Sequence, residues 1–125
     1  MPLPPPPPAT DTARRAQEAF HRDVLDEVVA AVARYDVVII GMAVNPSVGR
    51  ARQAAVAAGV TPHCLDFGGY LSQWQRRLAI KLWSGWPTFP QVFVKGTLVG
   101  GNDRLRKAIA DGTFQALLDG PRAGT

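Results

Sequence analysis

The order of apolar and polar residues predicts a helix and then a strand in the first third of the chain. From Asp11, apolar residues recur at helical spacing, whereas residues 37–40 form a continuous apolar run. Such a short run is typical of a strand that is buried on both faces. We therefore expect an N-terminal helix that packs on the domain and a central strand after it. The helical stripe consists of Phe20, Val24, Leu25, Val28, Val29 and Val32.

The middle of the chain repeats this alternation of helix and strand. A second helix is expected to end at Gly59 and to be followed by a short strand at residues 63–66. A strand, a helix and a further strand make a βαβ unit with a right-handed crossover. We expect a third helix from Gly69 to about Ser84. The face of the second helix would carry Val48, Ala51, Arg52, Ala55 and Val56, and that of the third Leu71, Trp74, Leu78 and Leu82.

Residues 85–101 carry the clearest turn signals. A β-branched and aromatic run at residues 92–94 is followed by Lys95-Gly96 and a second apolar run at 97–99, which predicts a hairpin with a two-residue loop. Pro90 precedes the first strand, where an X-Pro bond can be cis. Gly100-Gly101 ends the second strand, and Asn102 can cap a helix that follows it. That last helix would bury Leu105, Ile109, Phe114 and Leu117.

Composition limits the domain organisation and the partners. The 125 residues, 46% hydrophobic and 19% charged, suit a single domain over residues 11–125. Residues 1–10, MPLPPPPPAT, are expected to form a disordered proline-rich tail. No apolar run reaches the roughly 20 residues of a membrane span, and the basic-then-apolar order of a signal peptide is missing, so we expect a cytoplasmic protein without membrane contact.

Charge and cysteine content add two further limits. The net charge is +4, but the basic residues are not interleaved with aromatic residues as in a nucleic-acid recognition motif. We therefore do not expect nucleic-acid binding. A single cysteine excludes an internal disulfide and a cysteine-based metal site within one chain.

The stretch WPTFP, followed by a hairpin, GG, a variable residue, Asp and an amphipathic helix, resembles the C-terminal half of a glutaredoxin. The resemblance covers roughly residues 37–118. It implies a thioredoxin-like α/β fold, with a central mixed sheet of about four strands flanked by helices, to which this chain adds an N-terminal helix. One fold hosts many activities, so the resemblance bears on fold more than on function.

The same resemblance implies a site for glutathione. In the family, the second proline of the motif is cis, and the backbone beside it pairs with the cysteinyl part of glutathione. A helix N-terminus holds the γ-glutamyl carboxylate, for which its free N–H groups and dipole are suited, and a guanidinium grips the glycyl carboxylate. A corner without any ligand, and an arginine on a solvated helix face, remain the alternatives. Carried over, the site comprises Arg77, Thr88, Phe89, Pro90, Gly100, Gly101, Asn102 and Asp103.

The catalytic cysteines of the family are replaced in this chain. Where dithiol glutaredoxins carry Cys-Pro-Tyr-Cys, residues 45–48 read Asn-Pro-Ser-Val, and Met42 stands at the lysine that contacts glutathione. Thiol–disulfide exchange needs a thiolate, whereas Asn45 is neutral and can only cap the helix. We therefore expect no catalytic residue at Asn45 or Val48. We also expect no metal and no iron–sulfur cluster, because monothiol glutaredoxins hold their cluster through the same first cysteine.

Cys64 is the one remaining thiol, and it falls in the predicted second strand beside His63. A lone cysteine in a strand is most often a small buried hydrophobic residue, and this one does not fall at the family's active position. His63 is interpreted as a residue at the end of that strand rather than as a catalytic base.

Three functional hypotheses follow. The first is a redox-inactive glutaredoxin-like protein that keeps a groove for glutathione or for a γ-glutamyl or thiol-containing peptide, as a binding or regulatory module. The second is a glutathione-linked thiol–disulfide oxidoreductase of cell redox homeostasis that uses Cys64 or a thiol of a partner protein. The third is a protein-interaction domain with a vestigial groove, whose contact surface includes Trp74, Trp83, Trp86 and Phe89.

Overall fold

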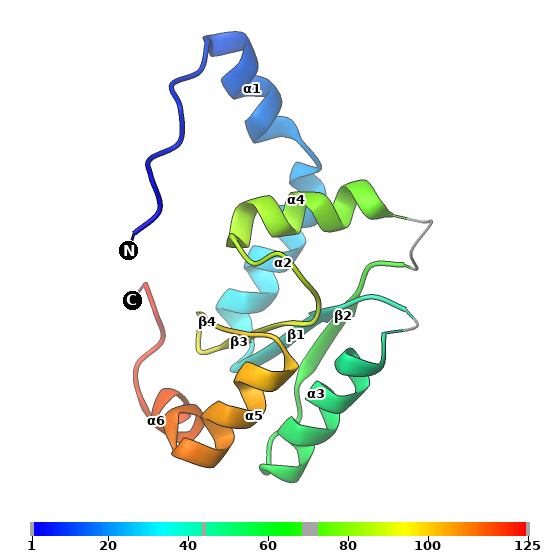
Figure 1. Ribbon diagram of the computed structural model, residues 1–125, viewed down its shortest axis with the longest axis vertical. Helices are drawn as coiled ribbons and strands as arrows, with labels where there is room; N and C mark the ends of the chain where they lie inside the picture. Colours follow the sequence, from blue (N-terminus) through cyan, green and yellow to red (C-terminus); the bar gives the residue numbers. More distant parts are fainter. Residues whose placement is uncertain (1, 44, 69–72, 125) are drawn as a thin grey trace.

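The computed structural model describes residues 2–43, 45–68 and 73–124. Its four-stranded sheet lies between two layers of helices (Figure 1). Within the described residues, the elements in chain order are α1 (Asp11–Ala19), α2 (Arg22–Arg34), β1 (Val37–Gly41), α3 (Pro46–Ala57), β2 (His63–Asp66), α4 (Trp74–Ser84), β3 (Gln91–Val94), β4 (Thr97–Gly100), α5 (Asn102–Asp111) and α6 (Thr113–Asp119).

The sheet has the strand order β2-β1-β3-β4. Strand β1 pairs in parallel with β2 and antiparallel with β3, and β3 pairs antiparallel with β4. The predicted mixed sheet, the crossover from β1 through α3 to β2, and the hairpin are therefore confirmed.

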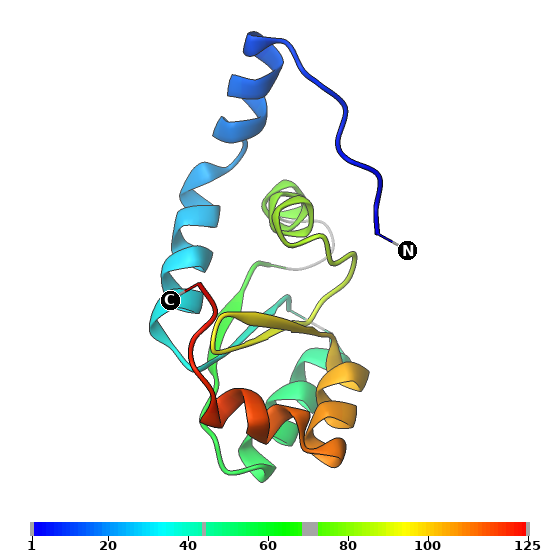
Figure 2. The same cartoon turned by 90° about the vertical axis from the view of Figure 1, so that its left-hand side faces the viewer.

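Strand β1 is buried on both faces, as its apolar run predicts. Because side chains alternate along a strand, Val38 and Ile40 join the core under α2 and α4, while Val37 and Ile39 join the core under α3, α5 and α6. Figure 2 shows these two helical layers on opposite sides of the sheet. All four residues are at most 3% exposed, so β1 contributes to both cores at once.

The predicted N-terminal helix is in fact two helices. At the junction, His21 has a left-handed backbone, with φ of 45°, which a continuous helix does not allow. Helix α2 packs on the domain through Val24, Val28 and Ala31, but α1 buries no residue and extends beyond the rest of the molecule (Figure 2). The last predicted helix is likewise divided, because Gly112 has φ of 87° between α5 and α6.

Helix α4 presents a different face to the core from the one predicted. Trp74 and Leu82 are 56% and 69% exposed, whereas Ala79 and Ile80 are buried under α2. The buried face also contains Arg77, which donates a hydrogen bond to the Phe67 carbonyl, so this face does not follow the apolar stripe. The predicted start of this helix at Gly69 and Leu71 lies outside the described residues.

The hairpin has the predicted two-residue loop. Val94 and Thr97 are paired across it, and both loop residues have positive φ, 50° at Lys95 and 82° at Gly96. Two positive φ values define a type I′ turn, whose twist matches that of the flanking strands. This turn sets the register in which β4 leads to the start of α5.

Candidate functional site

A cavity of about 420 Å³ lies where the segment before β3 meets the starts of α3 and α5. Six of the predicted site residues line it: Thr88, Phe89, Pro90, Gly101, Asn102 and Asp103. The other two predicted site residues do not line the cavity: Gly100 is the last residue of β4, directly before Gly101, and Arg77 lies on α4. Ser47, Trp86 and Arg104 complete the lining.

The Phe89–Pro90 peptide bond is cis, as predicted. Both residues are buried, and the Gln91 side-chain amide donates a hydrogen bond of 3.0 Å to the Trp86 carbonyl. This bond closes the loop on itself immediately before β3. The loop therefore enters the sheet in a fixed position, and its residues Thr88, Phe89 and Pro90 line the cavity.

The opposite wall is the N-terminus of α5, and its cap differs from the prediction. The N-cap residue is Gly101 and not Asn102, so no side chain caps the helix with a hydrogen bond. Asn102 is instead the first helical residue and is 7% exposed. Among the described residues, its Oδ1 has no hydrogen-bond partner. The helix start thus provides both unpaired backbone donors and a buried acceptor.

Trp86 and Arg104 were not identified from the sequence as site residues. The Arg104 guanidinium lies 5.7 Å from the centroid of the Trp86 ring, close enough for a cation–π interaction. Gly100 has a φ of 121°, which favours glycine, and a Cβ atom there would come within 3.0 Å of the Arg104 side chain and 3.1 Å of this ring. The available signal was Trp86 at the head of WPTFP, together with the basic residues early in α5.

Asn45 caps α3, as predicted, and also connects the helix to the cis-proline loop. Its Oδ1 accepts a 2.9 Å hydrogen bond from the Ser47 N–H, and its Nδ2 donates a 3.2 Å bond to the Phe89 carbonyl. Val48 and Met42, which stand at two further positions compared with the family, are apolar and buried, with 5% and 8% of their surface exposed, whereas Pro46 is exposed and Ser47 half-buried. No thiol stands at the start of α3.

Arg77 lies on the buried face of α4. It is 6% exposed, and its Nη1 donates a 2.9 Å hydrogen bond to the Phe67 carbonyl at the end of the β2 segment. One helical turn further on, the Lys81 ammonium lies 5.6 Å from the centroid of the Phe89 ring. Lys81 therefore brings a positive charge nearer to the cis-proline loop than the sequence alone indicated.

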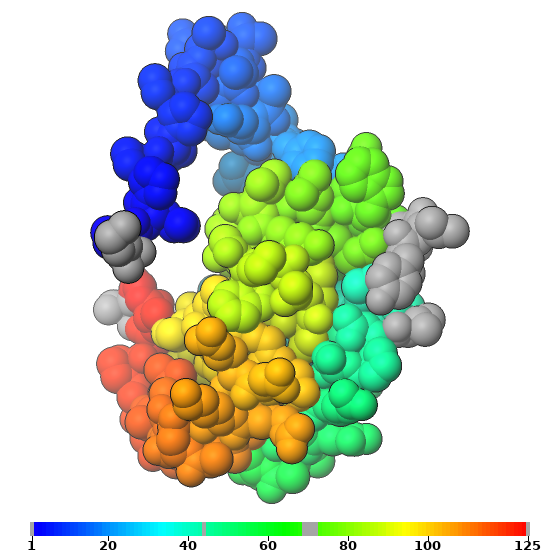
Figure 3. Space-filling model, viewed as in Figure 1, coloured from blue at the N-terminus to red at the C-terminus, as the bar shows by residue number. Residues whose placement is uncertain are grey.

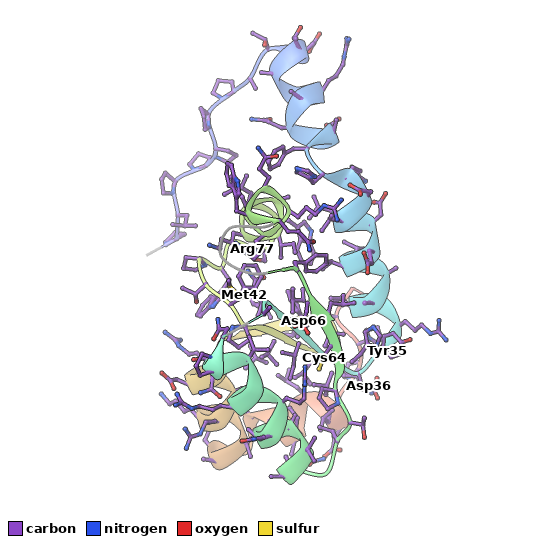
Figure 4. All side chains as sticks on the ribbon, turned by 90° about the vertical axis from the view of Figure 1, so that its right-hand side faces the viewer. Tyr35, Asp36, Met42, Cys64, Asp66 and Arg77 are labelled. Atoms are coloured by element: carbon purple, nitrogen blue, oxygen red, sulfur yellow. The ribbon has the colours of Figure 1, made fainter. Side chains whose placement is uncertain are left out.

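Cys64 lies on β2, away from the cavity. Figure 4 shows it on the same strand as Asp66, apart from Met42 and Arg77. It is half-buried, its Sγ is 3.9 Å from the Pro62 carbonyl oxygen, and as a hydrogen-bond partner it raises the pKa of the Arg52 guanidinium. The adjacent His63 ring stacks on Tyr35 at 3.9 Å, in keeping with a strand-end role.

No helix in residues 2–43, 45–68 and 73–124 has the length and apolar character needed to cross a membrane. Within the same ranges, histidine, cysteine and acidic side chains form no cluster of three or more that could hold a metal ion.

Comparison with known proteins identifies the family. No family model matches the sequence. A glutaredoxin-like protein of Dictyostelium discoideum is 44% identical over 95 residues, which are 76% of this chain and 77% of that protein. A probable monothiol glutaredoxin of Legionella pneumophila is 36% identical over 69 residues, 55% of this chain and 74% of its own.

Solved structures support the fold. A buckwheat glutaredoxin–glutathione complex superposes with a TM-score of 0.69 at 19% identity, covering 81% of this chain and 92% of that chain. At this identity the likeness concerns the thioredoxin fold alone. Together with the sequence relatives and the cis-proline loop beside the start of α5, it leads to one conclusion: the chain belongs to the glutaredoxin family.

Proposed function

We propose that the protein binds glutathione, or a peptide with a γ-glutamyl or thiol group, in the cavity beside Pro90. We further propose that it acts as a binding or regulatory module without thiol–disulfide catalysis. The observation that carries the proposal is the cavity itself, which joins the Thr88–Pro90 backbone to the start of α5. The buckwheat glutaredoxin–glutathione complex supports the choice of ligand, since that protein shares the fold.

The lining residues fit the chemistry of such a ligand. Unpaired N–H groups at the start of α5 and the nearby Arg104 favour a carboxylate, while Asp103 favours an ammonium group. The buried Asn102 Oδ1 needs a hydrogen-bond donor, which an amide or ammonium group of the ligand would supply. The Phe89 carbonyl already accepts a bond from Asn45 but keeps a second lone pair for the peptide.

The residue at the start of α3 supports the proposed absence of catalysis. Disulfide exchange requires a thiolate that attacks sulfur, and an asparagine amide cannot do so. Both polar atoms of the Asn45 side chain are engaged in hydrogen bonds that fix the helix and the loop. The arrangement thus retains a wall of the groove while it lacks the nucleophile.

Binding is tested by titrating reduced glutathione to millimolar concentration and following backbone amide chemical shifts. We expect saturable shifts at Phe89, Gly101 and Asp103, because these residues line the cavity. The matched control is the isomeric tripeptide in which glutamate is joined through its α-carboxyl, which cannot present the same carboxylate and ammonium. Equal responses to both peptides, or shifts confined to other surfaces, would contradict the proposal.

Catalysis is tested with a mixed disulfide of glutathione and a small thiol. The expected rate equals the background rate, both for the protein and for Cys64→Ser. Activity that disappears in Cys64→Ser would instead favour the oxidoreductase hypothesis, in which the half-buried thiol beside Arg52 is the nucleophile.

A further inference from the structure

A second cavity, of about 730 Å³, lies between α1 and the exposed face of α4, and we refer to it as the α4 groove. Its floor is formed by Leu78, Leu82 and Trp83, which are 36%, 69% and 41% exposed, and Phe20, the residue that follows α1, forms one side. None of the lining residues that the structure describes is charged. Apolar side chains gathered in one place on a surface of this kind mark a binding surface.

The proline tract reaches the edge of this groove. Thr10 caps α1, because its Oγ1 accepts a 3.2 Å hydrogen bond from the Ala13 N–H and its carbonyl accepts one from Arg14. The chain reverses direction there, so the residues before Thr10 run back beside α1 toward α4 (Figure 2). Pro6 lines the groove, while Leu3 is 88% exposed, and Figure 3 shows open space between this segment and α4.

We propose that residues 4–8, the five consecutive prolines, dock along the α4 groove of their own chain and cover Leu82 and Trp83. A run of prolines is already extended as a polyproline II helix, so docking costs little conformational entropy. Aromatic-lined grooves recognise this conformation. Prolines also lack N–H groups, so an apolar surface leaves no backbone donor unsatisfied.

The lining of the groove provides the complementary polar groups. Prolyl carbonyls need donors, and the Trp83 indole N–H and the Gln17 side-chain amide can both donate. Trp83 also packs on Phe93 of β3 at 5.7 Å between ring centroids, which holds its ring beside the sheet. The docked tract would therefore lie on a side chain that is already supported from below.

Connectivity favours the protein's own tract over a separate partner. Only Ala9 separates the last proline from the Thr10 cap, and a short connection of this kind gives an effective concentration of about millimolar or more. The uncharged lining offers no acidic group for the basic residues that flank many proline-rich ligands. The tract of this chain has no basic residue, so its chemistry matches the groove.

The test uses the full chain with Pro5→Gly, Pro6→Gly and Pro7→Gly, which keeps its length but removes the preformed conformation. The three tryptophans give three indole N–H signals in NMR spectra. We expect the Trp83 signal to shift and to gain relaxation from a soluble paramagnetic agent. Trp74 lies on the same helix outside the groove and Trp86 lines the other cavity, so both signals should stay unchanged.

A synthetic peptide of residues 3–10 provides the second measurement. Added to the triple glycine variant, it should restore the original Trp83 signal, and Leu82→Ser in that variant should weaken this response. Identical Trp83 signals in the original protein and the glycine variant would overturn the proposal. So would a glycine variant whose Trp83 becomes protected only as its concentration rises and dimers form, because a second copy would then be the occupant.

Discussion

At the scale of single residues, Asn45 shows how the start of α3 is maintained without a cysteine. Its amide donates to the Phe89 carbonyl and accepts from the Ser47 N–H, so it connects two walls of the groove. A thiol placed at this position would meet the unpaired N–H groups of the helix start.

Asn45→Cys in a Cys64→Ser background should therefore produce a reactive thiol. Its pKa is expected to fall below the roughly 8.5 of a free cysteine, because the helix N-terminus and the Lys81 and Arg104 charges favour the thiolate. The measurement is the pH dependence of alkylation, followed by the rate of mixed-disulfide formation with oxidised glutathione.

The matched control for this thiol is Gln53→Cys in the same background, since Gln53 is exposed on the same helix, well away from its start. We expect the Asn45→Cys variant to react with oxidised glutathione faster than this control. If both thiols share one pKa and one rate, the groove does not hold glutathione, and protein interaction becomes the better account of the molecule.

Gly41 is fixed by its neighbour on α3. A Cβ atom there would lie 2.6 Å from Cγ1 of Val48, a branched side chain with little freedom to move. Gly41→Ala should lower the free energy of unfolding by about 1–3 kcal/mol through overpacking, as measured by urea denaturation. Val48→Ala should remove much of this cost when the two changes are combined, and purely additive effects would show that the contact is not the cause.

At the scale of elements, the sequence predicted those parts in which a local rule decides the structure. The run at residues 37–40 identified β1, and Lys95-Gly96 identified the hairpin loop. The sequence did not identify the buried face of α4, because the tertiary contacts of Arg77 and Ile80 outweighed the larger apolar stripe on the other face. The division of α1 from α2 depends on one left-handed residue, His21, which has no strong local signal.

The hairpin loop permits an element-scale prediction. Lys95 has φ of 50°, a left-handed conformation that is costly for most side chains but is common for asparagine. Lys95→Asn should therefore raise the free energy of unfolding by up to about 1 kcal/mol. The control is Lys107→Asn within α5, which should not stabilise the protein, and an equal gain in both variants would argue against the turn as the origin.

The parts of the candidate site that depend on backbone conformation could be predicted from the sequence. The motif WPTFP located the cis peptide, and the glycine pair located the start of α5. Arg77 was assigned to the site by its position in a motif. Its side chain is buried and donates to the Phe67 carbonyl, and its role toward glutathione stays a prediction. The pairing of Arg104 with Trp86 depends on distance across the fold, for which one sequence holds no signal.

At the scale of the whole molecule, Arg122 joins the C-terminal segment to the end of α2. It donates to the Val32 and Tyr35 carbonyls, at 2.8 and 3.3 Å, and forms an ion pair with Asp36 at 2.8 Å. The next residue, Ala123, donates its N–H to the Lys95 carbonyl. These contacts link the end of α2, the hairpin and the C-terminal segment.

Arg122→Ala should lower the free energy of unfolding by about 1–3 kcal/mol, because part-buried carbonyls lose a charged donor. Chemical denaturation measures this loss. Arg122→Lys should recover only part of it, since an ammonium group cannot reproduce the planar set of donors. Full recovery by lysine would indicate that charge alone, and not this geometry, is what matters.

The pairing of β1 with β3 has a consequence for synthesis on the ribosome. Val37 is aligned with Val94, so the strand that contributes to both cores obtains its second neighbour only when most of the chain has been translated. Until then β1 can pair only with β2, and its far edge exposes unpaired N–H and C=O groups. We therefore expect nascent chains that stop before residue 91 to depend on chaperones, and those that include the hairpin to escape them.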